Sequence, residues 1–273
     1  MQSEYAAVYR ELYHRHWWWR AREDRIVSVL RRLGFSGKNA AILDVGCGDG
    51  LFFDRLREFG VAEGVEPDAS LLQPDGPHRS SIYARAFDDT FQPAGERRRY
   101  DVILMLDVLE HMPNAEAALR HALSLLAPDG VIVATVPAFQ ALWTGHDVIN
   151  QHVMRYDRAA FRRLADAAGM RIDTTRYLFH WVAPLKLATH LAERCDPRND
   201  GTRQPRPPRV PPRPVNRTLY WFTRLEQQLF GRVPLPFGSS LLVIGGPLGG
   251  AAGAERATPP VPHRDRRSEQ PSP

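Results

Sequence analysis

The most informative part of the sequence is a glycine-rich turn that follows a short apolar run. It reads Ile42-Leu43-Asp44-Val45-Gly46-Cys47-Gly48-Asp49-Gly50. Glycine allows backbone conformations that a Cβ would forbid, and it lets a ligand approach the main chain closely. We therefore expect a nucleoside-bearing cofactor at this turn. The alternative is a turn that serves tight packing alone, as in many α/β proteins.

An acidic residue after the next apolar run narrows the choice of ligand. Glu66 follows Val65 and lies 22 residues after Asp44. A carboxylate in this place can accept hydrogen bonds from both ribose hydroxyls of an adenosine. The pyrophosphate-binding pattern GxGxxG would place its third glycine at position 51, where this chain has Leu51. Glu66 thus indicates a ribose, Leu51 disfavours a nicotinamide dinucleotide, and an exposed loop acid is the alternative for Glu66.

These residues need a sheet to hold them, and the sequence predicts one. Short apolar runs alternate with helical stretches, which is the pattern of a parallel sheet with crossover helices. Runs 102–106 and 131–136 are apolar almost throughout, as expected for central strands covered on both faces. A helix is predicted over 158–168, with Asp157 as N-cap and Gly169 as C-cap. The predicted strands are 41–45, 61–65, 82–86, 101–106, 131–136, 170–179 and 239–244, with another helix at 114–126.

Five motifs in order resemble class I S-adenosylmethionine-dependent methyltransferases of the type 11/12 group. They cover roughly residues 40–169, and together they are far more specific than any one of them. The resemblance implies S-adenosyl-L-methionine as cofactor. It also implies a Rossmann-like α/β fold, with a seven-stranded, mostly parallel sheet, helices on both faces and an antiparallel last strand. The motifs are Asp44 to Gly50, Gly64-Val65-Glu66-Pro67-Asp68, Tyr100-Asp101-Val102-Ile103-Leu104, Asp107-Val108-Leu109-Glu110-His111 and Leu126-Ala127-Pro128-Asp129-Gly130.

The expected organisation has three parts. Residues 1–39 form an N-terminal helical cap, residues 40–248 the methyltransferase domain, and residues 249–273 a disordered tail rich in Gly, Ala, Pro and charge. Within the domain, residues 180–236 form an insertion before the last strand. Its parts are an apolar helix at 181–191, an extended Pro/Arg-rich linker at 197–214 and an amphipathic helix at 217–230.

The resemblance also assigns roles to residues around the cofactor. Asp44 and the glycines would line its methionine part, and Glu66 would hold its ribose. Asp88 or Asp89 would reach the adenine amino group, although the polar family position after the third strand is Arg85 here. Phe87 is the alternative at that place, as an apolar wall. The expected cofactor-binding residues are Asp44, Gly46, Cys47, Gly48, Gly50, Glu66, Pro67, Asp88 and Asp107.

Three histidines are candidates for a catalytic base. A sulfonium already activates the methyl group, so the protein must align an acceptor and, where needed, remove its proton. His111 follows the fourth predicted strand, and His146 and His152 lie in the loop after the fifth. The alternatives are a structural role for His111 and an ordinary surface loop for the other two. The sequence does not choose among the three.

Three further segments resemble a methyltransferase subgroup often associated with glycan or lipid-linked pathways. They are His16-Trp17-Trp18-Trp19-Arg20, residues 146–156 with Arg155-Tyr156, and residues 235–241. Three adjacent tryptophans cannot share one helix face, so at least one should contact another element or a ligand. The subgroup resemblance implies a small-molecule or lipid/glycan-linked acceptor, and we expect transfer to oxygen rather than to nitrogen or carbon.

Composition limits the other classes of function. The chain is 43% hydrophobic and 25% charged, like an ordinary globular protein. Its two cysteines, Cys47 and Cys195, have no metal-ligand spacing, so neither a disulfide framework nor a metal site is expected. No apolar run approaches the roughly 20 residues that span a bilayer, and the N-terminus lacks a signal-peptide core. We therefore expect a cytoplasmic protein.

Charge and pattern bear on partners. The net charge of +5 lies largely in the Pro/Arg-rich linker, without interleaved aromatics, so no nucleic acid is expected. Peripheral membrane contact is compatible with the apolar stretch 179–191. Two rival functions stay open, a nicotinamide-dependent oxidoreductase and a non-catalytic binding module. Leu51 disfavours the first, and intact Asp44, Gly46 and Glu66 disfavour the second. The sequence does not predict the oligomeric state.

Overall fold

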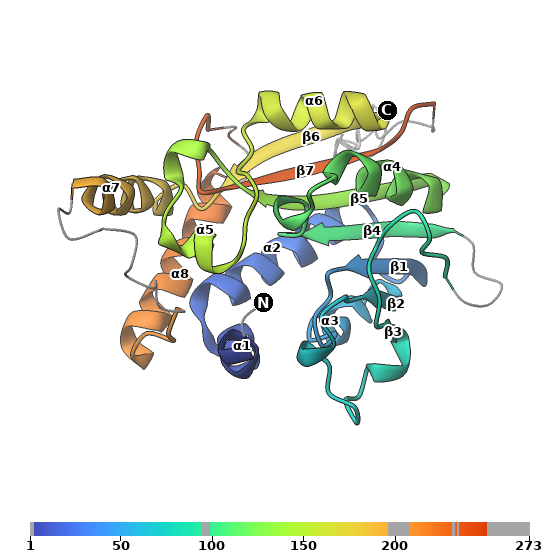
Figure 1. Ribbon diagram of the computed structural model, residues 1–273, viewed down its shortest axis with the longest axis horizontal. Coiled ribbons are helices and arrows are strands. Elements are labelled where there is room, and N and C mark those ends of the chain that lie inside the picture. The colour runs from blue at the N-terminus through green and yellow to red at the C-terminus, as the bar shows by residue number, and fades with distance from the viewer. Residues whose placement is uncertain (1–2, 94–98, 196–207, 231–232, 234, 250–273) are drawn as a thin grey trace, which may run out of the picture.

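One seven-stranded sheet organises the computed structural model, which describes residues 3–93, 99–195, 208–230, 233 and 235–249 (Figure 1). The strand order is β3-β2-β1-β4-β5-β7-β6, and β7 runs antiparallel to β5 and β6 while the other neighbours are parallel. The expected Rossmann-like sheet with an antiparallel last strand is confirmed. The strands are β1 Ala40–Val45, β2 Gly60–Val65, β3 Ile82–Tyr83, β4 Tyr100–Leu106, β5 Leu126–Pro137, β6 Met170–Leu178 and β7 Ser240–Pro247.

Helices cover both faces of this sheet. The cluster on one face joins the sheet to α4 and α6, and the cluster on the other joins it to α1, α2 and α3. The α-helices are α1 Ser3–Arg15, α2 Trp17–Arg32, α3 Phe53–Leu56, α4 Ala115–Leu125, α5 Gly145–Ile149, α6 Arg158–Ala168, α7 Val182–Cys195 and α8 Arg213–Phe230. Short 3-10 helices lie at Ala69–Leu71, Arg79–Ser81, Leu109–His111 and Gln140–Leu142.

Alternation along the strands explains the two clusters. In β1, Leu43 joins the α4–α6 cluster, whereas its neighbour Ile42 joins the α2 cluster, and neither side chain is exposed. Successive side chains of a strand point to opposite faces, so a strand between two helical layers is apolar along most of its length. Burying each such side chain contributes about 1.5–3 kcal/mol. The sheet is therefore a rigid base for the loops at its carboxyl edge.

Local signals set several boundaries. The side chain of Asp157 accepts a hydrogen bond from Ala160 N at the start of α6, and Gly169 ends that helix with φ +79°, as the sequence predicts. Strand β3 ends at Tyr83 rather than at 86, because the N–H of Arg85 turns back to the carbonyl of Tyr83.

Two other boundaries differ from the prediction. Strand β5 begins at Leu126 rather than at 131, since Leu126 pairs with Tyr100 before a bulge interrupts the register. Helix α8 begins at Arg213, so the end of the predicted 197–214 linker is helical; Pro214 is tolerated there because a first-turn N–H has no intrahelical partner.

The N-terminal helices share the core of the sheet. Ile26 and Leu30 of α2 are fully buried and belong to the same cluster as Ile42 of β1. The boundary expected at residue 39 stays a prediction. The expected disorder of the tail concerns residues outside the described ones from 250 on, and so does most of the 197–214 linker. Among the described residues, no helix is long and apolar enough to cross a membrane.

Candidate active site

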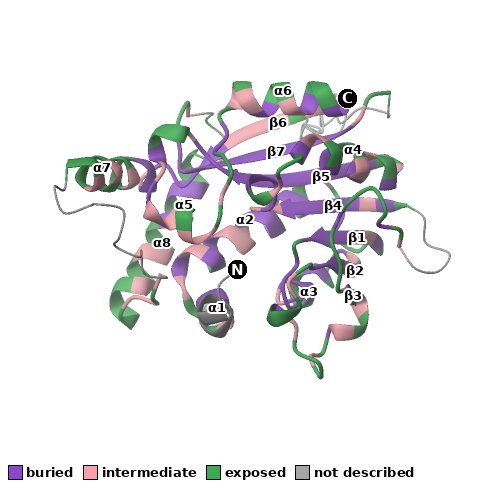
Figure 2. Ribbon diagram, viewed as in Figure 1, coloured by how far each residue is buried: buried purple, intermediate pink, exposed green. Residues whose placement is uncertain are grey.

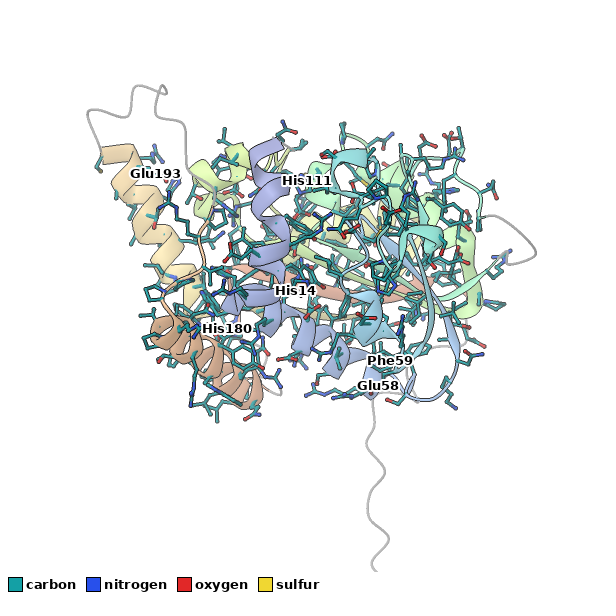
Figure 3. All side chains as sticks on the ribbon, turned by 90° about the horizontal axis from the view of Figure 1, so that it is seen from below. His14, Glu58, Phe59, His111, His180 and Glu193 are labelled. Atoms are coloured by element: carbon teal, nitrogen blue, oxygen red, sulfur yellow. The ribbon has the colours of Figure 1, made fainter. Side chains whose placement is uncertain are left out.

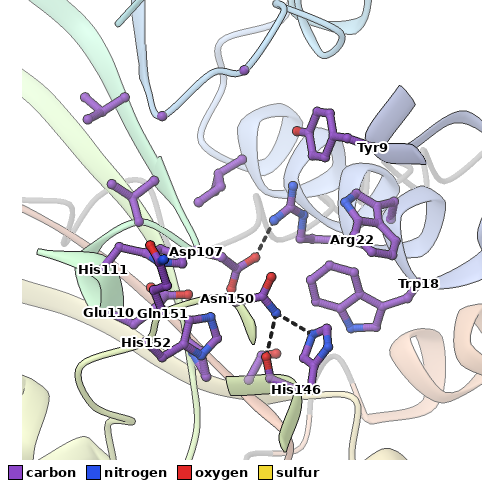
Figure 4. Close-up of a pocket in the computed structure, with 18 of the residues that line it drawn as sticks. Tyr9, Trp18, Arg22, Asp107, Glu110, His111, His146, Asn150, Gln151 and His152 are labelled. Atoms are coloured by element: carbon purple, nitrogen blue, oxygen red, sulfur yellow. Dashed lines mark hydrogen bonds and ion pairs between the residues drawn. The ribbon is translucent and has the colours of Figure 1, made fainter. Parts of the chain in front are cut away.

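A cavity of about 620 Å³ opens at the carboxyl edge of the parallel strands (Figure 4). Open α/β sheets bind ligands at this edge, where loops after neighbouring strands converge. The structure brings to it five of the nine expected cofactor residues and all three candidate bases. These eight lining residues are Gly46, Gly48, Glu66, Pro67, Asp107, His111, His146 and His152.

The glycine-rich turn supplies one wall through its main chain. Gly46 has φ +72°, in the left-handed region that favours glycine, and its N–H donates to the carbonyl of Val65 at 2.8 Å. A Cβ at this position would lie 2.6 Å from Cγ2 of Val108, which is closer than real Cβ atoms approach. Both its conformation and its neighbour therefore require glycine at position 46.

Glu66 is fixed by the same turn. Its side chain is nearly buried, its Oε2 accepts from Gly48 N at 2.9 Å, and its Oε1 accepts from Asp68 N at 2.9 Å. Burial raises the pKa of Glu66, while the two backbone N–H groups oppose that shift. Each carboxylate oxygen keeps capacity for a further hydrogen bond. Glu66 can therefore accept hydrogen bonds from a diol in the cavity, beside the apolar side chains of Leu71 and Phe87.

Three expected cofactor residues lie behind this wall rather than in it. Asp44 is 5% exposed at the end of β1 and does not line the cavity, and burial raises its pKa to about 7. Cys47 turns its thiol into the core cluster on the α2 face. Gly50 packs against Phe53 and His78. These residues shape the turn, and the structure does not place their side chains at the cavity.

Asp88 is the fourth expected residue that the structure leaves outside the cavity. Its carboxylate is exposed and accepts from the N–H and the hydroxyl of Thr90, at 2.9 and 2.6 Å. Those local bonds close a turn, and Asp88 is not among the residues that line the cavity. Its neighbour Asp89 is exposed too. Phe87 lines the cavity instead, so the apolar alternative describes this position.

Asp107 meets a partner that the sequence did not suggest. It follows β4 with φ +57° and forms an ion pair with Arg22 of α2, 85 residues away in the chain. The guanidinium of Arg22 lies 5.2 Å from the ring centroid of Trp18, and all three side chains line the cavity. Helix α2, which precedes the sheet, thus contributes the positive charge of Arg22 to the site. No local sequence pattern around Arg22 indicated this role.

The three candidate bases lie on one side of the cavity (Figure 4). The rings of His111 and His152 meet edge to face, with centroids 4.8 Å apart. Nδ1 of His152 lies 2.8 Å from Oδ1 of Asp147, and Nε2 of His146 lies 3.0 Å from the amide nitrogen of Asn150. Of the three histidines, His152 is the one with a carboxylate behind its ring.

Asp147 is the centre of a buried polar network. It has no exposed surface, and its oxygens receive Nε and Nη2 of Arg155 at 2.8 and 2.9 Å and the N–H of Thr144 at 2.8 Å. Burial alone would raise the pKa of Asp147, but the bonds from His152 and Arg155 outweigh burial and lower it well below its usual range. The 146–156 segment therefore holds an ionised carboxylate against His152.

Glu110 stands out among the buried acids. It is 1% exposed, lines the cavity, and neither of its oxygens has a hydrogen-bond partner among the described residues. Burial and the nearby Asp107 raise its pKa well above the usual value. Glu110, His111 and His152 offer ligand atoms within 4.8 Å of one another, so these three could hold a metal ion. The sequence suggested no metal ligands, because His152 reaches this cluster from another loop.

The tryptophan segment packs and lines the cavity at once. Trp17 lies 5.2 Å from Trp181, Trp18 stacks on Phe179 at 5.6 Å, and Trp19 contacts the ring of His16. The three tryptophans also belong to the cavity wall. The expectation that at least one would contact another element is confirmed.

The comparisons with known proteins identify the family. A family model described as a methyltransferase domain matches residues 18–175, more than half of the chain. The chain belongs to this family. The resemblance to class I S-adenosylmethionine-dependent methyltransferases is thereby confirmed, and S-adenosylmethionine is the cofactor. The oxidoreductase and binding-module alternatives fall away.

Individual relatives are more distant. A ubiquinone biosynthesis O-methyltransferase of Bradyrhizobium diazoefficiens is 30% identical over 118 residues, 41% of this chain and 44% of that protein, so the match spans less than half of the relative. The Escherichia coli protein of the same name is 25% identical over 180 residues, 59% of this chain and 75% of its own. A chain in the complex of the Haloferax volcanii Trm112 methyltransferase activator with a methyltransferase shares the fold, at TM-score 0.51 and 16% identity over 90% of this chain and 95% of its own.

Proposed function

We propose that this methyltransferase moves a methyl group from S-adenosylmethionine to a hydroxyl oxygen of a small or lipid-linked acceptor, with His152 as the general base. The observation that carries the proposal is the Asp147–His152 pair in the cavity wall, 2.8 Å between Nδ1 and Oδ1. A carboxylate at Nδ1 orients an imidazole so that Nε2 can take a proton. Oxygen acceptors with a hydroxyl group need such a base.

The residues at one end of the cavity fit the cofactor. Gly46 and Gly48 line the cavity without side chains, Glu66 offers two carboxylate oxygens for the ribose hydroxyls, and Leu71 and Phe87 give apolar walls for a purine. When bound, the cofactor supplies a methyl group already activated by its sulfonium. Glu66 then orients the nucleoside, while Asp44 acts indirectly by supporting the turn.

His152 takes the proton in this proposal. Its Nδ1 is engaged by Asp147, so Nε2 is the atom that accepts the hydroxyl proton as the oxygen attacks. Arg155 keeps Asp147 ionised, and the ionised carboxylate stabilises the imidazolium that forms. His111 lies edge to face with His152 and restricts the rotation of its ring. His146 is paired with Asn150 and serves to position the acceptor.

An acceptor with a phenolic hydroxyl fits the other end of the cavity best. Trp18, Met112 and Val182 line it with apolar and aromatic surface, on which a flat ring can stack. Lys186 lines the same end, where it favours an acidic hydroxyl over an alcohol. The name shared by the relatives, ubiquinone biosynthesis O-methyltransferase, supports transfer to oxygen.

A product analysis tests this function. The purified protein is incubated with S-adenosylmethionine and matched acceptors that carry a catechol, an aniline, a sugar hydroxyl or an activated ring carbon, and formation of S-adenosylhomocysteine is followed. We expect turnover with the catechol, and NMR of the product should show a methyl ether. A product methylated on nitrogen or carbon would overturn O-methylation, and turnover of sugar hydroxyls alone would overturn the phenolic acceptor.

A further inference from the structure

Much of helix α8 is exposed (Figure 2), and its exposed residues include large apolar side chains. Trp221, Phe222, Leu225 and Leu229 are 61, 53, 52 and 60% exposed. Their spacing of one, three and four residues places them on one stripe of the helix. A surface helix of a globular protein normally buries such a stripe against the core. Helix α8 therefore has the amphipathic pattern that the sequence predicts, but with the apolar side outward.

Polar contacts fix this orientation. The inner side of α8 buries Thr223, Glu226 and Gln227. Oε1 of Glu226 accepts from the N–H of Trp181 at 3.0 Å and lies 2.9 Å from Nδ1 of His180, while Nε2 of Gln227 donates to a carbonyl of α2 at 3.2 Å. Rotating the helix to bury the leucines would expose or break these bonds. These polar contacts therefore hold α8 with its apolar stripe exposed.

Helix α7 extends the same end of the molecule. Leu185, Leu187 and Leu191 are 58, 40 and 52% exposed. The two helices are joined where Trp181, just before α7, packs edge-on against Phe222 of α8 with centroids 5.7 Å apart, close to His180 in Figure 3. Leu187 and Leu191 are four residues apart and share one side of α7, whereas Leu185 lies about 200° around the helix from Leu187. We define the α7–α8 face by its members Leu187, Leu191, Trp221, Phe222, Leu225 and Leu229.

The charge beside this face is positive. Arg209, Arg213 and Arg217 are exposed, and Arg213 and Arg217 continue the four-residue spacing that leads to Trp221. The one acidic residue within 208–230 is Glu226, and it is buried. A basic helix with aromatic and leucine side chains on one side is the pattern of a helix that lies in the interface of an anionic bilayer. Aromatic side chains between the arginines and the leucines suit the boundary between lipid headgroups and acyl chains. This arrangement favours a bilayer over a protein partner.

We infer that the α7–α8 face docks this protein on an anionic lipid bilayer, with its leucines and aromatic rings at the acyl boundary and Arg213 and Arg217 at the headgroups. The cavity lies next to this face, because Val182 and Lys186 of α7 line the cavity while Leu187 and Leu191 of the same helix are exposed. A lipid-linked acceptor could then reach the cavity without leaving the membrane surface. That consequence rests on the proposed function, whereas the docking itself does not.

Vesicle sedimentation tests the inference on the full chain. We expect binding to phosphatidylcholine vesicles that contain about a third phosphatidylglycerol to be about tenfold stronger than to phosphatidylcholine alone, and to weaken with salt. Leu225→Glu with Leu229→Glu should reduce it by about tenfold or more, because it places charge in the acyl boundary. Leu248→Glu is the matched control, since Leu248 is 70% exposed away from the helix, and it should bind like the unaltered protein.

Two further measurements keep the outcomes distinct. Calorimetry with S-adenosylhomocysteine should give the same affinity for the unaltered protein and the Leu225→Glu, Leu229→Glu protein, which shows that the variant is folded and its cofactor end intact. Sedimentation velocity without lipid reports on self-association. Absence of vesicle binding, equal binding to both kinds of vesicle, or a dimer that the two glutamates dissociate would overturn the inference.

Discussion

The two ends of the cavity are built in different ways. The proposed cofactor end comes from adjacent parallel strands: Gly46 and Gly48 follow β1, Glu66 follows β2, and main-chain groups hold the Glu66 carboxylate. The acceptor end is assembled from distant parts of the chain. Trp18 and Arg22 come from α2, His152 from the loop after β5, and all three line the cavity together with Lys186 of α7. At that end, side chains rather than main-chain groups form the cavity surface.

This difference separates what is fixed from what can vary. The backbone conformation of a glycine turn tolerates few substitutions, so a cofactor end of this kind constrains its sequence strongly. Side chains from separate loops can change one at a time without disturbing the sheet. The cofactor can therefore be assigned from family and local geometry, while the acceptor depends on packing that is particular to this chain.

The largest expected effect is at the acceptor end. His152→Gln removes the proposed base, and kcat should fall by about 100- to 10,000-fold. The affinity for S-adenosylhomocysteine should stay the same, because His152 is bonded to Asp147 and not to the groups that hold Glu66. The matched control is His146→Gln, which should lower kcat less and raise KM more. Full activity of the His152 variant, measured with a catechol acceptor across pH, would show that His152 is not the general base.

The next effect concerns stability at the acceptor end. Arg155→Met leaves the fully buried Asp147 without its main partner, and breaking a buried ion pair in this way costs about 3–5 kcal/mol. Urea denaturation should show this loss. Arg162→Met, on the exposed side of α6, should stay within about 0.5 kcal/mol of the unaltered protein. Equal stability of both variants would mean that the network does not hold the loop.

A pH dependence should arise from the histidines of the acceptor end. Burial lowers the pKa of His16 and of His146 to about 4 in the folded protein, from 6.5. At these two histidines the unfolded chain binds more protons between pH 6.5 and 4, so their contribution to stability falls as pH falls through that window. The raised pKa values of Asp44 and Glu110 act in the opposite direction, so the histidine contribution is measured as a difference between proteins. By urea denaturation between these pH values, we expect the unaltered protein to lose about 1–3 kcal/mol more stability than the His16→Asn, His146→Gln protein. Equal pH dependence of the two proteins would assign the effect to other groups.

The smallest expected effect is the difference in stability between two glycine variants, which tests the turn at the proposed cofactor end. Gly46→Ala combines a positive φ with a Cβ 2.6 Å from Val108 and should cost about 2–4 kcal/mol. Gly34 has φ +78° but no atom within 4 Å of a Cβ, so Gly34→Ala should cost only about 1–2 kcal/mol. The difference between the two variants in free energy of unfolding, measured by urea denaturation, gives the cost of the contact with Val108. Equal costs would show that Val108 moves aside easily.

Much of the sheet could be predicted from the sequence, because strand burial and turn glycines are local signals. The strands around Asp44 and Glu66 lie where the apolar runs place them, and Asp157 and Gly169 cap α6 as expected. The family resemblance implied that Asp88 or Asp89 reaches the adenine, but the structure leaves Asp88 exposed, bonded to Thr90 and outside the cavity wall.

The rest of the site depends on contacts between distant segments. Arg22 contacts Asp107 only because α2 packs against the sheet. Glu110 has no hydrogen-bond partner among the described residues because the surrounding segments bury it away from water. The outward side of α8 was equally hidden, since periodicity shows that a helix is amphipathic but not which side faces the core. Polar bonds from Glu226 and Gln227 decide it.

Calorimetric titration of S-adenosylhomocysteine into the unaltered protein, Glu66→Gln and Asp88→Asn tests the central claim most directly. The account predicts that Glu66→Gln weakens binding by about 10- to 100-fold, through the loss of charge-assisted bonds to the ribose. Asp88→Asn should bind like the unaltered protein, because Asp88 is exposed and outside the cavity. Unchanged affinity in the Glu66 variant, or a loss confined to the Asp88 variant, would contradict this placement of the cofactor.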